Sequence, residues 1–102
     1  PAMYEATMGI VPTRRGGGSP MTYDVVGPVC ESGDWLGRDR VLAVQPGARL
    51  AILSAGAYGM TMASNYNTRG RAAEVLVIGD QAHLVREREQ PAELFRGERL
   101  LP

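Results

Sequence analysis

Residues 27–34 read Gly27-Pro28-Val29-Cys30-Glu31-Ser32-Gly33-Asp34 and contain the only cysteine of the chain. The four residues before them, Tyr23-Asp24-Val25-Val26, have the aromatic and β-branched character of a strand. Successive side chains of a strand point to opposite faces. If this strand runs from residue 21 to residue 30, Cys30 and Glu31 lie at its end and point different ways, just before a turn. Reactive groups are commonly displayed at such places, so this stretch is the first candidate site.

Short apolar runs separated by turn residues continue along the rest of the chain. We expect buried strands at 41–44 and 50–53, the first covered on both faces, with a type II turn at Gln45-Pro46-Gly47-Ala48 between them. Residues 73–78 and 81–85 flank Gly79-Asp80, which favours a β-hairpin. Residues 90–97 place proline early and glycine last, as in a terminal helical turn. The pattern predicts an all-β fold, a mainly antiparallel β-barrel or sandwich with short terminal helical turns.

Composition narrows the classes of function. A chain of 102 residues fits a single domain, and its 11 basic and 11 acidic residues cancel, which argues against nucleic acid or an anionic membrane as a partner. No apolar run approaches the roughly 18 residues that a transmembrane helix needs. One cysteine allows no internal disulfide, which is compatible with a reducing cytoplasm. We therefore expect a cytoplasmic protein.

All eleven basic residues are arginines, and the chain has no lysine. Schiff-base chemistry needs a side-chain amine, and the arginine guanidinium stays protonated at any working pH. This polypeptide therefore cannot supply the lysine of such a reaction from its own sequence. That lysine would have to come from another chain or segment.

Three segments carry a resemblance to a known family. Residues 27–34 closely resemble the Cys-Glu-Ser-Gly-Asp motif of the diaminopimelate decarboxylases, which are pyridoxal-phosphate enzymes of bacterial lysine synthesis. Pro1-Ala2-Met3-Tyr4 looks like the end of the family's Arg-Pro-x-x-Tyr substrate motif, without the arginine, and Gly56-Ala57-Tyr58-Gly59 is similar to its cofactor-tyrosine segment. The order and spacing of the three segments fit the family over nearly the whole chain.

The resemblance implies that residues 1–102 are a single C-terminal β-domain of a longer two-domain enzyme. An N-terminal (β/α)₈ barrel would carry the Schiff-base lysine and most of the pyridoxal-phosphate site. The enzyme would be a homodimer that decarboxylates meso-2,6-diaminopimelate to L-lysine, with an active site shared between subunits. The isolated chain, which lacks the lysine, would be inactive.

The resemblance also implies roles for four residues. Cys30 would be the catalytic acid that delivers a proton to the substrate α-carbon, and Glu31 would bind the distal ammonium of the substrate. Tyr58 would bind the cofactor phosphate and contact the substrate, and Tyr4 would bind the distal carboxylate. No metal site is expected, because His83, the only histidine, has no partners at metal-ligand spacing and is interpreted as structural.

Simpler interpretations remain open for each of these residues. Cys30 is an inert buried thiol on one of them, Glu31 a solvated charge, and Tyr4 and Tyr58 are packing residues. Two other functions also remain: a related ornithine or arginine decarboxylase domain, and a non-catalytic β-domain that mediates association. The glutamate that follows Cys30, where the polyamine enzymes tend to have aspartate, favours the diaminopimelate branch.

Overall fold

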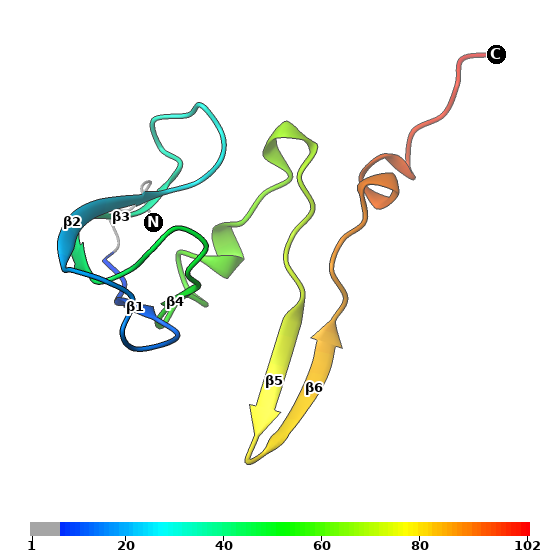
Figure 1. The fold of residues 1–102 in the computed structure, drawn as a ribbon. Helices are drawn as coiled ribbons and strands as arrows, with labels where there is room; N and C mark the ends of the chain where they lie inside the picture. The colour runs from blue at the N-terminus through cyan, green and yellow to red at the C-terminus, as the bar shows by residue number, and fades with distance from the viewer. Residues whose placement is uncertain (1–6) are drawn as a thin grey trace. The chain divides into compact units, whose positions relative to one another are not determined.

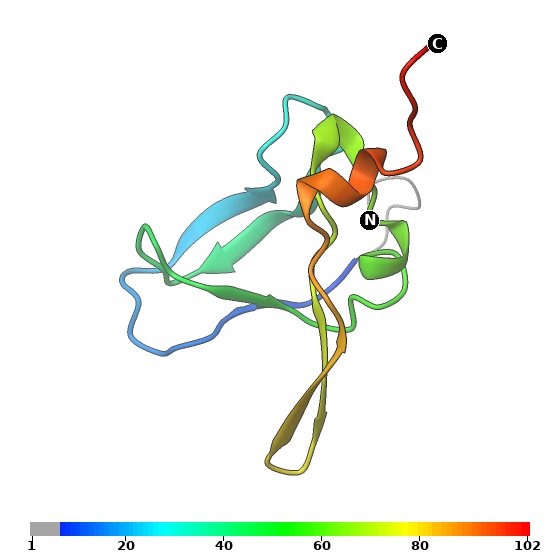
Figure 2. The ribbon, with the colours of Figure 1, turned by 90° about the vertical axis from the view of Figure 1, so that its right-hand side faces the viewer.

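A computed structural model describes residues 7–102, which form two compact units that meet in the sequence at Met62 and Ala63. The first contains strands β1 (Ile10–Pro12), β2 (Met21–Val26), β3 (Trp35–Leu42) and β4 (Leu50–Ile52) and the 3-10 turn η2 (Met60–Met62). The second contains the 3-10 turn η3 (Tyr66–Thr68), strands β5 (Glu74–Ile78) and β6 (Gln81–Arg86), and the 3-10 turn η4 (Pro91–Phe95) (Figures 1 and 2). The all-β class is confirmed.

Every strand of the described residues pairs antiparallel, in three two-stranded sheets. In the first unit β2 pairs with β3, from Met21 opposite Leu42 to Val26 opposite Trp35. Two register shifts interrupt this ladder at Val25. Such irregularities bend a strand and re-aim the side chains beyond them. The end of β2 that leads into residues 27–34 therefore carries the local distortion.

The core of the first unit is small and lies between β1 and β3. Met8, Ile10 and Leu42 are its buried apolar side chains among the described residues. Gly37 is buried in β3, and a Cβ there would lie 2.6 Å from Cδ1 of Ile10. Glycine at this position lets β3 approach β1, a strand that the sequence pattern did not predict.

The predicted strand at 21–30 is wrong at its end, because β2 stops at Val26. Pro28 has no N–H to donate to a ladder, and the N–H of Val29 binds the side chain of Asp34 instead of a neighbouring strand. Cys30 and Glu31 therefore lie in a loop, not on alternate faces of a strand.

The predicted strand at 41–44 is also wrong. Residues 35–42 form one continuous strand, since β2 pairs along its whole length. Val41 is 69% exposed while its neighbour Leu42 is 5% exposed, which is the alternation of a strand covered on one face only. The strand predicted at 50–53 is present as β4 but only half-buried, and Leu53 lies beyond it and is exposed.

Local turn signals were read correctly. The N–H of Ala48 donates to the carbonyl of Gln45 at 3.0 Å, and Gly47 has a φ of +87°, as a type II turn requires. Strands β5 and β6 form the predicted hairpin, with Gly79 at a φ of +61° in its turn. Pro91 opens η4, which confirms the terminal helical turn.

The hairpin of β5 and β6 exposes apolar side chains on both faces. The register places Val75, Val77, Ala82 and Leu84 on one face and Leu76, Ile78 and His83 on the other. Val77 is 64% exposed and Ile78 is 62% exposed. A hairpin that is apolar on two sides is typical of an element covered on both faces in a larger assembly.

A polar clasp holds the chain entering this hairpin to the chain leaving it. The Arg71 guanidinium forms an ion pair with Glu89 at 3.2 Å, and the Arg71 N–H and the Asn65 amide both donate to the other Glu89 carboxylate oxygen, at 3.0 and 2.6 Å. The bond from the Arg71 N–H, followed by that from Asn65, holds the pKa of Glu89 below its usual value of 4.5. No pattern in the sequence pairs Arg71 with Glu89, 18 positions along the chain.

No helix in the described part of the chain is long and apolar enough to cross a membrane.

Candidate active-site loop and its relatives

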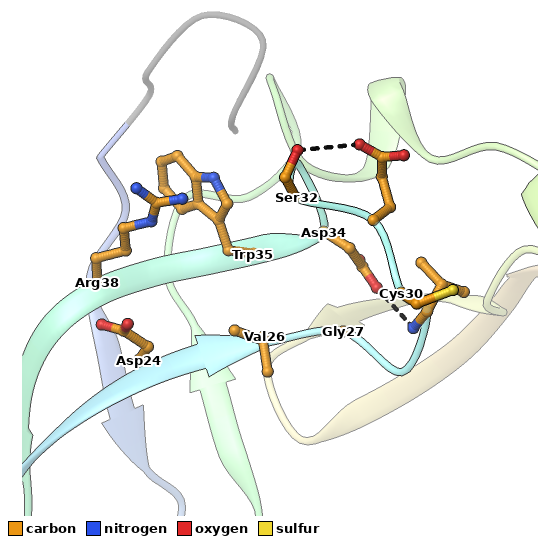
Figure 3. A pocket seen from close by; sticks show the side chains of 10 residues that line it. Asp24, Val26, Gly27, Cys30, Ser32, Asp34, Trp35 and Arg38 are labelled. Carbon is orange, nitrogen blue, oxygen red and sulfur yellow. Dashed lines mark hydrogen bonds between the residues drawn. The ribbon is translucent and has the colours of Figure 1, made fainter.

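The loop of residues 27–34 connects β2 to β3 and forms one side of an open pocket of about 440 Å³. The lining is completed by residues of the two strands, Asp24 and Val26 on β2 and Trp35 and Arg38 on β3 (Figure 3). The side chains of Cys30 and Glu31 both line this pocket. The structure therefore brings together the two residues of the loop to which the resemblance assigns chemistry.

Hydrogen bonds between the ends of the loop close it. The N–H of Gly27 donates to the carbonyl of Asp34 at 2.8 Å. The N–H of Val29 donates to Oδ2 of Asp34 at 3.0 Å, which is the dashed line at Asp34 in Figure 3. A second pair of bonds forms the turn, from the Asp34 N–H to the Glu31 carbonyl and from the Trp35 N–H to the Gly33 carbonyl, each 3.0 Å. The last residue of the motif thus binds three other residues of the loop.

Gly27 is required by the same arrangement. A Cβ built at residue 27 would collide with both carboxylate oxygens of Asp34. The Asp34 carboxylate therefore lies against the bare backbone of Gly27, where only glycine leaves room for it. Sequence reasoning did not single out Gly27 or Asp34; their position as the first and last residues of the motif was the available signal.

Glu31 uses one carboxylate oxygen within the loop. Its Oε1 accepts bonds from the Ser32 hydroxyl at 3.3 Å and from the Gly33 N–H at 3.4 Å. Within residues 7–102 both hydrogen bonds to this carboxylate reach Oε1, which leaves Oε2 able to accept a bond from a bound molecule. The side chain is thus oriented by the loop and still has an acceptor to offer.

The Cys30 thiol is free and exposed. In this chain the thiol is therefore not buried, because β2 ends at Val26 and Cys30 lies in the loop, and its part in catalysis stays a prediction. An exposed thiol at the edge of a pocket can meet a substrate.

Carboxylates dominate the charge around the pocket. Asp24, Glu31 and Asp34 line it, against a single guanidinium, that of Arg38. The Arg38 guanidinium stacks over the Trp35 ring, 4.8 Å from its centroid, while Asp24 accepts a bond from the Asp39 N–H at 2.9 Å. An excess of carboxylates favours a ligand group that is positively charged, such as an ammonium.

Tyr58 belongs to a separate part of the first unit, the turn between β4 and η2, and does not line this pocket. Its backbone has a φ of +60°, a left-handed conformation that costs a non-glycine residue about 1–2 kcal/mol. Bonds from Met60 to the Ala55 carbonyl and from Thr61 to the Gly56 carbonyl hold the turn, at 2.7 and 3.1 Å. Tyr58 is 48% exposed, and its role, whether cofactor binding or packing at the edge of the domain, stays a prediction.

The sequence also predicted roles for Tyr4 and His83. Tyr4 lies outside the described residues. His83 lies on β6 opposite Leu76 and is exposed. Among residues 7–102 no group of three or more histidine, cysteine, aspartate or glutamate side chains is placed to hold a metal ion.

Comparison with known proteins places this loop in a family. The sequence model described as "Pyridoxal-dependent decarboxylase, C-terminal sheet domain" matches residues 1–56. A diaminopimelate decarboxylase of Pseudomonas aeruginosa is 58% identical over 102 residues, which is 100% of this chain and 25% of that protein. The corresponding enzyme of Vibrio cholerae is 54% identical over 102 residues, 100% of this chain and 24% of that protein.

The fold agrees with a solved structure as well. A crystal structure of diaminopimelate decarboxylase from M. jannaschii in complex with L-lysine superposes with a TM-score of 0.87 at 43% identity, covering 100% of this chain and 23% of that one. The chain therefore spans about a quarter of the length of the relatives that it matches. From the family match and the all-β fold, the chain belongs to the family of C-terminal sheet domains of pyridoxal-dependent decarboxylases.

Proposed function

We propose that residues 1–102 act as the C-terminal β-domain of a diaminopimelate decarboxylase, which converts meso-2,6-diaminopimelate to L-lysine with pyridoxal phosphate. The observation that carries the proposal is the closed loop 27–34, which presents Cys30 and Glu31 together at a pocket rich in carboxylates. Identities of 58% and 54% to enzymes of that name support it. A location in the cytoplasm, where an amino-acid biosynthetic enzyme is expected, is part of the same proposal.

Glu31 and Cys30 take different roles in this proposal. Oε2 of Glu31 accepts a charge-assisted hydrogen bond from the distal ammonium of the substrate, while Oε1 stays bonded to Ser32 and Gly33. The Cys30 thiol delivers a proton to the substrate α-carbon after carbon dioxide has left. A protonated thiol within reach of the α-carbon can act as a general acid.

Pyridoxal phosphate would supply the electron sink that takes up the electron pair released when carbon dioxide departs. This chain fits only the phosphate end of that cofactor. The Tyr58 hydroxyl is a hydrogen-bond donor on a half-exposed side chain, and a Cβ added at Gly56 would meet no atom within 4 Å, so there is room for a phosphate beside the turn. Because the sequence has no lysine, the reactive amine must come from the remainder of the enzyme.

The proposal also names partners. The larger part of the enzyme, a (β/α)₈ barrel domain, and a second subunit would cover the two apolar faces of the β5–β6 hairpin. A homodimer with shared active sites is supported by the separation of Tyr58 from the pocket of Cys30 and Glu31. In such a dimer Tyr58 would serve its own subunit's cofactor, and the loop would reach the partner's active site. Tyr4 would bind the distal carboxylate of the substrate.

A chimeric enzyme tests the proposal directly. In it, this chain replaces the corresponding quarter of the Pseudomonas aeruginosa relative, which supplies the remaining three quarters. We expect the chimera to release carbon dioxide from diaminopimelate and to restore growth without lysine to a strain that lacks the enzyme, while the isolated chain does neither. Preference for ornithine or arginine over diaminopimelate would favour the related branch. A folded, cofactor-loaded chimera with no decarboxylase activity would refute the proposal and leave an association domain.

A further inference from the structure

The geometry of loop 27–34 points to a residue beyond Cys30 and Glu31. Strand pairing between Val26 and Trp35 holds only the two ends of the loop. Besides the bonds of the turn at Glu31 and Gly33, one side-chain contact reaches the first half of the loop, the bond from the Val29 N–H to Oδ2 of Asp34. Val29 immediately precedes Cys30, so this bond fixes the backbone from which the thiol projects.

The Asp34 carboxylate is committed to the loop itself. It is half-buried, it lies against the Gly27 backbone where a Cβ would collide with both its oxygens, and one oxygen accepts the Val29 bond. The backbone of the same residue binds Gly27 and Glu31. Figure 3 shows the Asp34 side chain pointing from the start of β3 across the loop, while the Cys30 side chain lies on the far side.

We propose that Asp34, seated against Gly27, is a positioning residue that sets where Cys30 and Glu31 stand relative to the substrate. This inference rests on the proposed decarboxylase function and adds to it a residue that holds the catalytic loop without touching the substrate. In this inference Cys30 and Glu31, in the middle of the motif, act on the substrate. Gly27 and Asp34, at its two ends, hold them in position. Misplacing a reacting group by about 1 Å can cost on the order of a hundredfold in rate.

Substitutions of Asp34 in the chimera show whether its carboxylate positions the loop or only stabilises the fold. Asp34→Asn keeps an oxygen that can accept the Val29 bond, whereas Asp34→Ala removes it. Because a displaced loop misplaces the reacting groups, we expect Asp34→Ala to lower kcat by at least about tenfold and Asp34→Asn to retain activity within about threefold. Glu98→Ala, which removes a carboxylate from the C-terminal segment, is the matched control and should leave kcat unchanged.

Gly27→Ala probes the same contact from the other side. Its Cβ should push the Asp34 carboxylate away and lower kcat as Asp34→Ala does. Because the clash needs the carboxylate, the double substitution Gly27→Ala with Asp34→Ala should be no worse than Asp34→Ala alone. Independent effects that multiply would contradict a shared mechanism.

Three further measurements distinguish positioning from stability. Activity is normalised to folded, cofactor-loaded enzyme, the pH dependence of kcat is recorded, and amide hydrogen exchange is followed in the peptide that contains Val29. We expect Asp34→Ala, but not Asp34→Asn, to shift the limb of the pH profile that depends on Cys30 and to speed exchange in that peptide, with cofactor affinity unchanged. An active parent chimera in which Asp34→Ala and Asp34→Asn behave alike overturns the inference alone. An inactive parent chimera overturns the proposed function and the catalytic purpose of this contact with it.

Discussion

Replacing Glu31 with glutamine tests the carboxylate that the loop presents to the pocket. Glutamine keeps one oxygen, which can continue to accept the bonds from Ser32 and Gly33, so the loop should stay closed. The change falls on the other terminal atom, Oε2, which becomes an NH₂ group that can no longer accept a bond from an ammonium. The perturbation therefore removes one interaction with the substrate and little else.

The size of the effect follows from this geometry. One charge-assisted hydrogen bond is lost, because Oε1 is already occupied within the loop, and such a bond contributes roughly 1.5–3 kcal/mol. We therefore expect kcat/KM for diaminopimelate to fall about 10- to 100-fold in the chimera. Glu98→Gln makes the same charge change in the C-terminal segment and should leave kcat/KM unaltered.

A second substrate makes the assay specific. 2-Aminopimelate keeps the reacting end and the distal carboxylate of diaminopimelate but has no distal ammonium. Glu31→Gln should therefore change kcat/KM for 2-aminopimelate by less than about threefold. Equal losses for both substrates would show that the substitution damages the loop, and no loss for either would return Glu31 to a solvated surface charge. Each result would refute the reasoning.

Three further predictions concern other residues. Cys30→Ala should lower kcat by about 10²–10⁴-fold, the usual contribution of general acid catalysis, with cofactor affinity unchanged; full activity per folded, cofactor-loaded molecule would contradict this role. Tyr58→Phe should weaken pyridoxal phosphate binding by about 10- to 100-fold and be rescued at saturating cofactor, whereas Tyr66→Phe, a matched exposed tyrosine, should not weaken it. Because the pKa of Glu89 is lowered in the folded chain, its stabilising effect is present above pH 4.5 and is lost as the pH falls through the folded-state pKa. Unfolding curves should accordingly show a steeper loss of stability below pH 4.5 in wild type than in Glu89→Gln, and parallel curves would argue against the clasp.

Elements that depend on neighbouring residues could be predicted from the sequence. The turn at Pro46-Gly47, the hairpin around Gly79-Asp80 and the helical turn at Pro91 all formed as expected. Each depends on backbone angles that glycine and proline favour locally. The residue types of the candidate site could also be predicted from the sequence. The motif contains Cys30 and Glu31 in one short stretch, and the lack of lysine shows which reactive group this chain cannot supply.

The bounds and the exposure of a strand depend on the segments that pair with it and cover it, which the hydrophobic pattern does not contain. An apolar run such as residues 41–44 looks covered on both faces, yet Val41 is exposed because β3 is covered on one side only. Likewise, β-branched residues before Cys30 suggested a longer β2. A competing bond from Val29 to Asp34, five positions along the chain, ended that strand at Val26.

The sequence by itself determined the chemistry that the loop can offer and the turns that surround it, since both depend on residue types and on local backbone preferences. Only the tertiary structure decided that the Asp34 carboxylate packs on Gly27 and that the Ile10 side chain packs on Gly37. The same holds for the contact between Arg71 and Glu89, 18 positions apart. The local conformational preferences of these residues do not determine which other residues they contact. These contacts form because packing brings a carboxylate to a bare glycine backbone or to a guanidinium, where van der Waals contact and hydrogen-bond geometry select one arrangement.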